Sequence, residues 1–216
     1  MNIIVERFNK IKSNIDLLKP IKPVNIIAVS KTFSLAHIQP LIEYGHNHFG
    51  ENKVQEAASK WLEIKKNQKN INLHMIGKLQ SNKAKNAVEI FDYVHSLDNQ
   101  KLADVLAKNE INLNKNLKYF IQVNIGNELQ KSGIPINELD GFYNYCTNEI
   151  KLKIIGLMVI PPNDKSSLKY FKSLNELNTT LALNELSMGM SADYIEAIKS
   201  GATFIRIGSS IFGNRG

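Results

Sequence analysis

Apolar and polar positions alternate along this chain in two rhythms. Short apolar runs rich in β-branched residues predict strands, and they span residues 25–31, 46–50, 73–77, 93–97, 118–125, 153–160, 185–189 and 203–207. Amphipathic stretches predict helices in the gaps, at residues 35–44, 53–66, 82–90, 100–109, 136–147, 167–181 and 192–200. A further helix is predicted before the first strand, where apolar residues recur at helical intervals from Ile4 to Leu18.

This alternation of strands and helices predicts a parallel sheet covered by helices. The eight units favour an α/β fold, a closed (β/α)8 TIM-like barrel with an extra N-terminal helix, formed by residues 1–216 as a single domain. An open, doubly wound sheet is the alternative. Its dinucleotide-binding form is disfavoured, because no G-x-G-x-x-G sequence opens a helix after the first strand.

Several element boundaries carry residues typical of helix ends. Gly45 and Gly201 follow predicted helices, where a left-handed residue often ends the helix. Ser81 and Ser191 precede helical runs and are candidate N-caps. Pro40 falls inside a helical pattern, which predicts either a kink or a helix that starts late.

The composition is that of an ordinary globular protein, with 43% hydrophobic and 22% charged residues. Nothing in the sequence approaches the run of about 18 apolar residues that a membrane span requires. Charges throughout the first twenty residues argue against a signal peptide. The single cysteine, Cys146, excludes an internal disulfide and indicates a reducing cytoplasm.

The formal net charge is +7, which raises the question of a nucleic-acid partner. The lysines are spread along the chain, and no basic block, RNA-binding aromatic signature or zinc-finger spacing accompanies them. Dispersed lysines are typical of solvated helix faces, so this pattern argues against nucleic-acid binding. A small anionic ligand is a further interpretation of the charge.

Unusual residues collect where the predicted strands end, which is where barrel enzymes carry their chemistry. Lys31 closes a buried run, and its amine suits a salt bridge, a phosphate contact or a covalent imine. The sequences "MGMS" at 188–191 and "RIGSS" at 206–210 place glycine-bearing turns after the last two strands. Two such turns on neighbouring strands predict a phosphate site, although each alone also fits a simple turn or an N-cap.

Seven ordered blocks together resemble the pyridoxal-phosphate homeostasis family. They are "AVSKT" at 28–32, "FGEN" at 49–52, "IGKLQSNK" at 76–83, "KSGI" at 131–134, "GLMVIPP" at 156–162, "LSMGMSADYIEAIKSGAT" at 186–203 and "RIGSSIFGNR" at 206–215. The barrel of this family is similar to the N-terminal domain of bacterial alanine racemases. The resemblance extends from about the first strand to the C-terminus.

The resemblance implies a set of residues that bind pyridoxal 5′-phosphate (PLP). The set consists of Lys31, which would carry PLP as an imine; Ser191, Gly208 and Ser209, which would hold the phosphate; Arg206, which would face the pyridine nitrogen; and Asn52 and Met158, which would border the cofactor or serve in packing. A cation beside the ring nitrogen makes the ring a poor electron sink, which argues against transaminase chemistry. The alternative for Arg206 is a salt bridge across the barrel mouth.

The function implied by the resemblance is intracellular PLP homeostasis: a cytoplasmic, monomeric carrier would buffer the cofactor or deliver it to apo-PLP enzymes, without a dedicated reaction. The alternative is a PLP-dependent amino-acid racemase, which needs an acid or base on each face of the imine. Lys31 could serve one face, but the sequence ends at Gly216 and offers no obvious donor for the other. A basic nucleic-acid module is the third hypothesis.

Other candidate residues leave alternatives open. Lys83 and Lys131 could attract a phosphorylated ligand or a partner, or they could be surface charges. Lys78 departs from the family pattern and receives no ligand role. His46, His48 and His74 show no metal-binding spacing, so they are interpreted as core or surface histidines. We predict no metal site.

Overall fold

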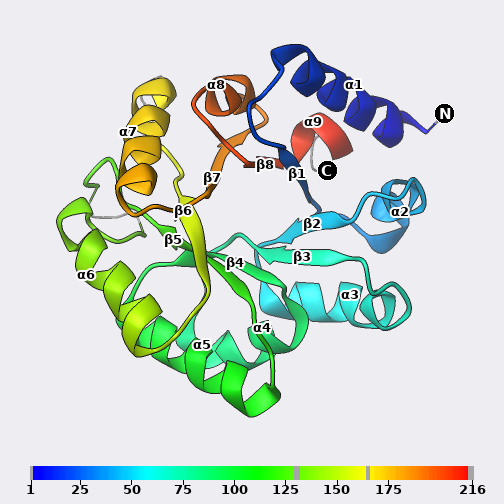
Figure 1. The fold of residues 1–216 in the computed structure, drawn as a ribbon. Coiled ribbons are helices and arrows are strands. Elements are labelled where there is room, and N and C mark those ends of the chain that lie inside the picture. The colour runs from blue at the N-terminus through cyan, green and yellow to red at the C-terminus, as the bar shows by residue number, and fades with distance from the viewer. Residues whose placement is uncertain (1, 129–131, 164–165, 214–216) are drawn as a thin grey trace.

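Eight parallel strands close into a barrel in the order of the chain, β1 to β8 (Figure 1). The computed structural model describes residues 2–128, 132–163 and 166–213. The strands are β1 (Asn25–Val29), β2 (His48–Glu51), β3 (Asn72–Met75), β4 (Tyr93–Leu97), β5 (Lys118–Gln122), β6 (Ile154–Met158), β7 (Glu185–Met190) and β8 (Phe204–Ile207). The barrel closes because β1 pairs with both β2 and β8. The predicted (β/α)8 barrel is therefore confirmed, and the open-sheet alternative is wrong.

Helices surround the barrel and connect its strands (Figure 1). They are α1 (Ile3–Leu18), α2 (Leu35–Glu43), α3 (Val54–Asn67), α4 (Ala84–Ile90), α5 (Gln100–Leu113), α6 (Leu139–Asn144), α7 (Ser167–Thr180), α8 (Tyr194–Lys199) and α9 (Ser209–Phe212). Short 3₁₀ segments, Ser81–Lys83 and Ile136–Glu138, precede α4 and α6, and a π-helical turn at Tyr145–Glu149 follows α6. No described helix is long and apolar enough to cross a membrane.

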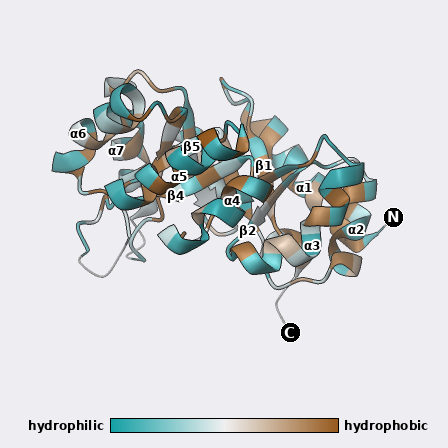
Figure 2. Ribbon diagram, turned by 90° about the horizontal axis from the view of Figure 1, so that it is seen from below, coloured by the Kyte–Doolittle hydropathy of each residue, from teal (hydrophilic) through white to brown (hydrophobic). Residues whose placement is uncertain are grey.

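The predicted N-terminal helix is present as α1, and its sequence explains where it starts and what it covers. The Asn2 side chain accepts a hydrogen bond from the Ile4 N–H at 2.9 Å, which caps the helix. Ile4, Phe8, Ile11 and Ile15 recur at helical spacing and are buried. This face packs against α2, α8 and α9, so α1 covers the outside of the barrel where β1 meets β8. Hydrophobic and hydrophilic residues alternate along the helices (Figure 2).

Side chains from alternate strand positions fill the barrel interior. Ile27, Tyr93, Phe120, Met158 and Phe204 come from five different strands and form one buried cluster. A larger cluster of buried apolar residues contains outward-facing strand residues and the inner faces of the helices. This arrangement is a packed core rather than a pore. It leaves the carboxyl ends of the strands as the place for chemistry.

Several predicted boundaries are corrected by the structure. Ser81 lies within a 3₁₀ segment and Ser191 lies three residues before α8, so neither side chain caps a helix. The helix α2 does not start late, because it begins at Leu35 and continues through Pro40. Gly45 and Gly201 have φ values of 92° and 96°, which confirms the predicted left-handed helix ends.

Candidate functional site

The turn after β1 places Lys31 at the mouth of the barrel. Side chains alternate along a strand, and Ile27 belongs to the interior cluster. Continuing this alternation puts Val29 and then Lys31 on the interior side. The chain turns directly afterwards, since Thr32 has φ 69° and the Phe33 N–H donates to the Ser30 carbonyl at 3.2 Å. Lys31 is half-buried at this turn.

A buried carboxylate fixes the outer side of the same turn. Glu51 is fully buried, and its Oε1 accepts from Ser30 Oγ at 2.7 Å, Lys60 Nζ at 2.9 Å and Trp61 Nε1 at 3.0 Å. Lys60 also donates to the Ser30 carbonyl at 2.9 Å. The sequence "FGEN" at 49–52 supports the family resemblance, but this role of Glu51 was not predicted from it. A carboxylate at the end of an apolar strand was the signal that could have indicated it, because a buried charge requires partners.

Arg206 lies inside the barrel on β8, where it is the register partner of Ile27 on the neighbouring strand β1. Its side chain is nearly inaccessible, with 4% of the residue exposed. The guanidinium donates to Ser187 Oγ at 2.7 Å and to the Val159 carbonyl at 2.8 Å. Burial lowers the pKa of Arg206 to about 10, while the charge of Asp193 acts in the opposite direction. The side chain therefore remains a cation, held by neutral acceptors rather than by an ion pair among the described residues.

The two glycine-bearing turns predicted after β7 and β8 lie side by side. Ser191 Oγ accepts from the Ser210 N–H at 3.5 Å, which joins the two turns. Gly189 has φ 92°, and a Cβ there would stand 2.5 Å from the Cβ of Ala197, so only glycine fits. Gly208 and the exposed Ser209 complete this edge of the mouth. A Cβ on Gly208 would meet Val29 at 3.5 Å, which places the turn beside β1 and the approach to Lys31.

The remaining predicted residues lie on the other side of the mouth or below it. Asn52 is half-buried and lines a cavity of about 410 Å³, which Gln122 and Lys78 also line. Met158 is fully buried within the interior cluster, so it packs below the mouth. Lys83 is half-buried in the 3₁₀ segment before α4, and Lys131 lies outside the described residues.

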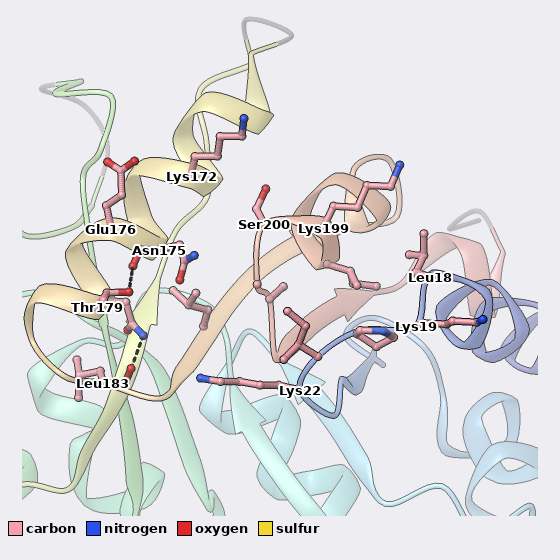
Figure 3. A pocket seen from close by; sticks show the side chains of 17 residues that line it. Leu18, Lys19, Lys22, Lys172, Asn175, Glu176, Thr179, Leu183, Lys199 and Ser200 are labelled. Carbon is pink, nitrogen blue, oxygen red and sulfur yellow. Dashed lines mark hydrogen bonds between the residues drawn. The ribbon is translucent and has the colours of Figure 1, made fainter.

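A larger cavity of about 650 Å³ lies at the opposite end of the barrel and does not contain the predicted site (Figure 3). It is formed by the segment before β1, by α7 and by α8. Four lysines line it, namely Lys19, Lys22, Lys172 and Lys199. Lys22 donates to the Asn184 carbonyl at 3.0 Å. Because none of the seven predicted cofactor residues lines this cavity, its size does not make it the candidate site.

Of the histidines predicted to be core or surface residues, His74 is fully buried. His95, which was not among them, is also fully buried. His48 is half-buried at the other end of the barrel interior, and His46 is half-buried against Phe8 of α1. The described residues contain no group of three or more histidine, cysteine, aspartate and glutamate side chains that could hold a metal ion. His95 was not singled out from the sequence, because its neighbours along the chain show no pattern.

The chain matches the family described as alanine racemase, N-terminal domain, across residues 7–216, and this is the class of barrel to which the fold and the site belong. It belongs more particularly to the family of pyridoxal phosphate homeostasis proteins. One such protein from Synechocystis sp. (strain ATCC 27184 / PCC 6803 / Kazusa) is 40% identical over 201 residues, covering 89% of this chain and 92% of the relative. Another, from Escherichia coli (strain K12), is 34% identical over 201 residues, covering 89% and 86%.

Solved structures agree with this assignment. PipY of Synechococcus elongatus PCC7942, determined with PLP bound, has a TM-score of 0.87 and 36% identity, covering 97% of this chain and all of PipY. Alanine racemase from Clostridium difficile 630 has a TM-score of 0.73 at 14% identity. That match covers 99% of this chain and 57% of the racemase, and it shows the shared barrel fold.

Proposed function

We propose that this chain binds PLP reversibly on Lys31 and serves in intracellular PLP homeostasis, buffering the cofactor or delivering it to apo-PLP enzymes. The observation that carries the proposal is the convergence at one mouth of three features. These are Lys31 in the turn after β1, a buried cation at Arg206, and the joined turns at Ser191 and Gly208. The family relationship supports it, since the relatives are named for PLP homeostasis and PipY was solved with PLP.

The residues present fit this cofactor. The joined turns offer a hydroxyl at Ser191 and backbone N–H groups at Gly208 and Ser209, a donor set that suits a phosphate. Asn52 borders the same mouth, while Met158 lies beneath it and supports it by packing. When bound, the cofactor supplies an aldehyde that reacts with a neutral lysine amine. Lys31 would provide that amine, and the Glu51 network would hold its turn in place.

Arg206 explains why binding would not be coupled to strong catalysis. A guanidinium keeps its proton because its pKa is far above that of a pyridine nitrogen, so it donates a hydrogen bond to the ring nitrogen without protonating it. A ring nitrogen beside such a donor stays unprotonated, which weakens the electron sink that carbanion chemistry needs. We therefore propose a carrier without a dedicated reaction, formed by residues 1–216 as one domain and acting as a cytoplasmic monomer.

The first experiment is spectroscopic. Purified protein mixed with PLP is expected to gain an absorbance band that borohydride removes, leaving a stable covalent adduct. Lys31→Ala is expected to fold with an unchanged melting temperature and to form no such adduct. Lys78→Ala is the matched control, because Lys78 lines the mouth cavity but receives no covalent role. An equal adduct yield in Lys31→Ala would reject the assignment.

A second experiment separates the carrier from the racemase. Amino acids are incubated in deuterium oxide with the PLP-loaded protein, and exchange at the α-carbon is measured. The carrier hypothesis expects exchange no faster than with free PLP, together with transfer of the cofactor to an added apo-PLP enzyme. Fast exchange with inversion at the α-carbon would instead establish the racemase.

A further inference from the structure

A chain of hydrogen bonds runs through the interior of the barrel from Arg206 toward its opposite end. Arg206 Nη1 donates to Ser187 Oγ at 2.7 Å, and Ser187 Oγ lies 2.8 Å from His95 Nδ1. His95 Nε2 lies 2.9 Å from His74 Nδ1, and His74 Nε2 lies 2.9 Å from His48 Nδ1. These five side chains come from β8, β7, β4, β3 and β2, so the chain crosses the barrel.

The chemistry of Arg206 determines the direction of these bonds. A guanidinium only donates, so Ser187 Oγ accepts from Arg206. If Ser187 then donates its own hydrogen to His95 Nδ1, each histidine carries its proton on Nε2 and donates to the next ring. The last N–H, on the half-buried His48, can then be satisfied by water.

The opposite direction would leave a donor without an acceptor. His95 would donate to Ser187 Oγ, which already accepts from Arg206, and the Ser187 hydrogen would need a third partner. The described residues offer none within hydrogen-bond distance, and Ser187 is fully buried. An unsatisfied buried donor costs about 1–3 kcal/mol. The direction that starts at Arg206 is therefore the stable one.

The surroundings keep the rings neutral. Burial lowers the pKa of His74 and of His95 well below its ordinary value, and the charge of Arg206 lowers that of His95 further. His95 stacks on Phe120 with ring centroids 4.3 Å apart, and His74 stacks on Tyr93 at 4.2 Å. Because these contacts involve the faces of the two histidine rings, the ring nitrogens form hydrogen bonds, within the part of the protein that the structure describes, only with the other members of the hydrogen-bond chain.

We propose that Ser187, His95, His74 and His48 form a one-directional hydrogen-bond chain that positions the Arg206 guanidinium, with His95 as a positioning residue. The chain makes Ser187 a pure acceptor toward Arg206, so that this N–H is fixed, and only the N–H groups not donated to Ser187 or to the Val159 carbonyl are left for a ligand. The chain is not a proton path to the ligand, because the guanidinium at its end cannot accept a proton. Its effect on the cofactor rests on the function proposed above.

The direction is tested by nuclear magnetic resonance on the cofactor-free protein with ¹⁵N-labelled histidine between pH 6 and pH 8. We expect His95 and His74 to be neutral, with Nδ1 unprotonated and Nε2 protonated. A proton on Nδ1 of His95, or a cationic His95 at pH 7, would overturn the proposal. This measurement requires neither PLP nor a variant, so it remains decisive if a variant fails to fold.

Two variants that differ in one acceptor test the positioning role. His95→Leu and His95→Asn both remove the imidazole, its stacking on Phe120 and its bond to His74. Only the asparagine side chain can still accept from Ser187 near the position of Nδ1. We expect His95→Leu to weaken PLP binding about tenfold, the effect of losing one hydrogen bond that orients a charged group. His95→Asn is expected to stay within about threefold of the parent.

The outcomes separate this inference from the proposed function. Equal weakening in both variants would show that the ring acts only by packing and would reject the positioning role. If the unaltered protein does not bind PLP, the proposed function fails. The direction of the chain is still decided by the histidine tautomers in that case.

Discussion

Acidification should destabilise this protein through the two histidines buried inside the barrel. His74 and His95 are fully buried, and burial lowers the pKa of each well below 6.5. The unfolded chain, in which these rings titrate normally near pH 6.5, binds protons that the folded chain does not. Stability is therefore complete above pH 6.5 and is lost as the pH falls below it.

The size of the effect follows from linkage. At pH 5 the solution is about 1.5 pH units below the pKa that the rings have in the unfolded chain. For each ring that stays neutral in the folded chain, the free energy of unfolding falls by about 1.4 kcal/mol per pH unit. Each ring therefore costs about 2 kcal/mol between pH 7 and pH 5, and the pair about 4 kcal/mol. This is a large part of the total stability of about 5–15 kcal/mol that single domains possess. The charge of Lys65 also lowers the pKa of His74, and the charge of Arg206 lowers that of His95, so nearby cations act in the same direction as burial.

The assay is urea unfolding of the parent protein and of His95→Asn at pH 7 and at pH 5. The variant lacks one titrating ring, so its loss of stability on acidification should be smaller by about 2 kcal/mol. Other titrating groups contribute equally to both proteins and cancel in this double difference. His37→Asn is the control, because His37 is exposed on α2, outside the barrel interior, and its loss leaves the interior rings intact. An equal loss of stability in the parent and in His95→Asn would refute the reasoning.

Three further substitutions test how the site is held in place. Glu51→Gln should destabilise the protein by about 3 kcal/mol in urea unfolding, because it leaves the Lys60 ammonium without its buried carboxylate. Gly189→Ala should cost about 2 kcal/mol or more, since φ is 92° and the new Cβ would clash with Ala197, and PLP titration should show weaker binding. Asn178→Ala should lower the thermal midpoint by several degrees, the equivalent of about 2 kcal/mol, because Asn178 bridges the backbone of Leu157 and Leu183.

The alternation of strands and helices was readable from the sequence because each element buries one face. The eight strands are present, and the helix ends at Gly45 and Gly201 follow from a backbone conformation that glycine favours. The strand ends were less predictable. The strand predicted at residues 118–125 stops at Gln122. Apolar residues continue past its end, where Val123 forms an isolated bridge with Ile134.

The site was predictable only where a motif marked it. Arg206 stands on β8 beside Ile27 of β1, and Lys31 lies in the turn after β1. The Glu51 network and the histidine chain were missed, because their partners lie on different elements. His95 and Ser187 are 92 residues apart, and only barrel closure brings them within 2.8 Å. No local pattern records such a contact.

The central claim is that PLP is bound covalently by Lys31, and peptide mapping tests it most directly. The protein is loaded with PLP, reduced with borohydride, weighed intact and then digested. We predict a single added cofactor on the intact chain and a single modified peptide, the one that contains Lys31. A reduced cofactor found mainly on another lysine, or spread over many lysines, would contradict the account.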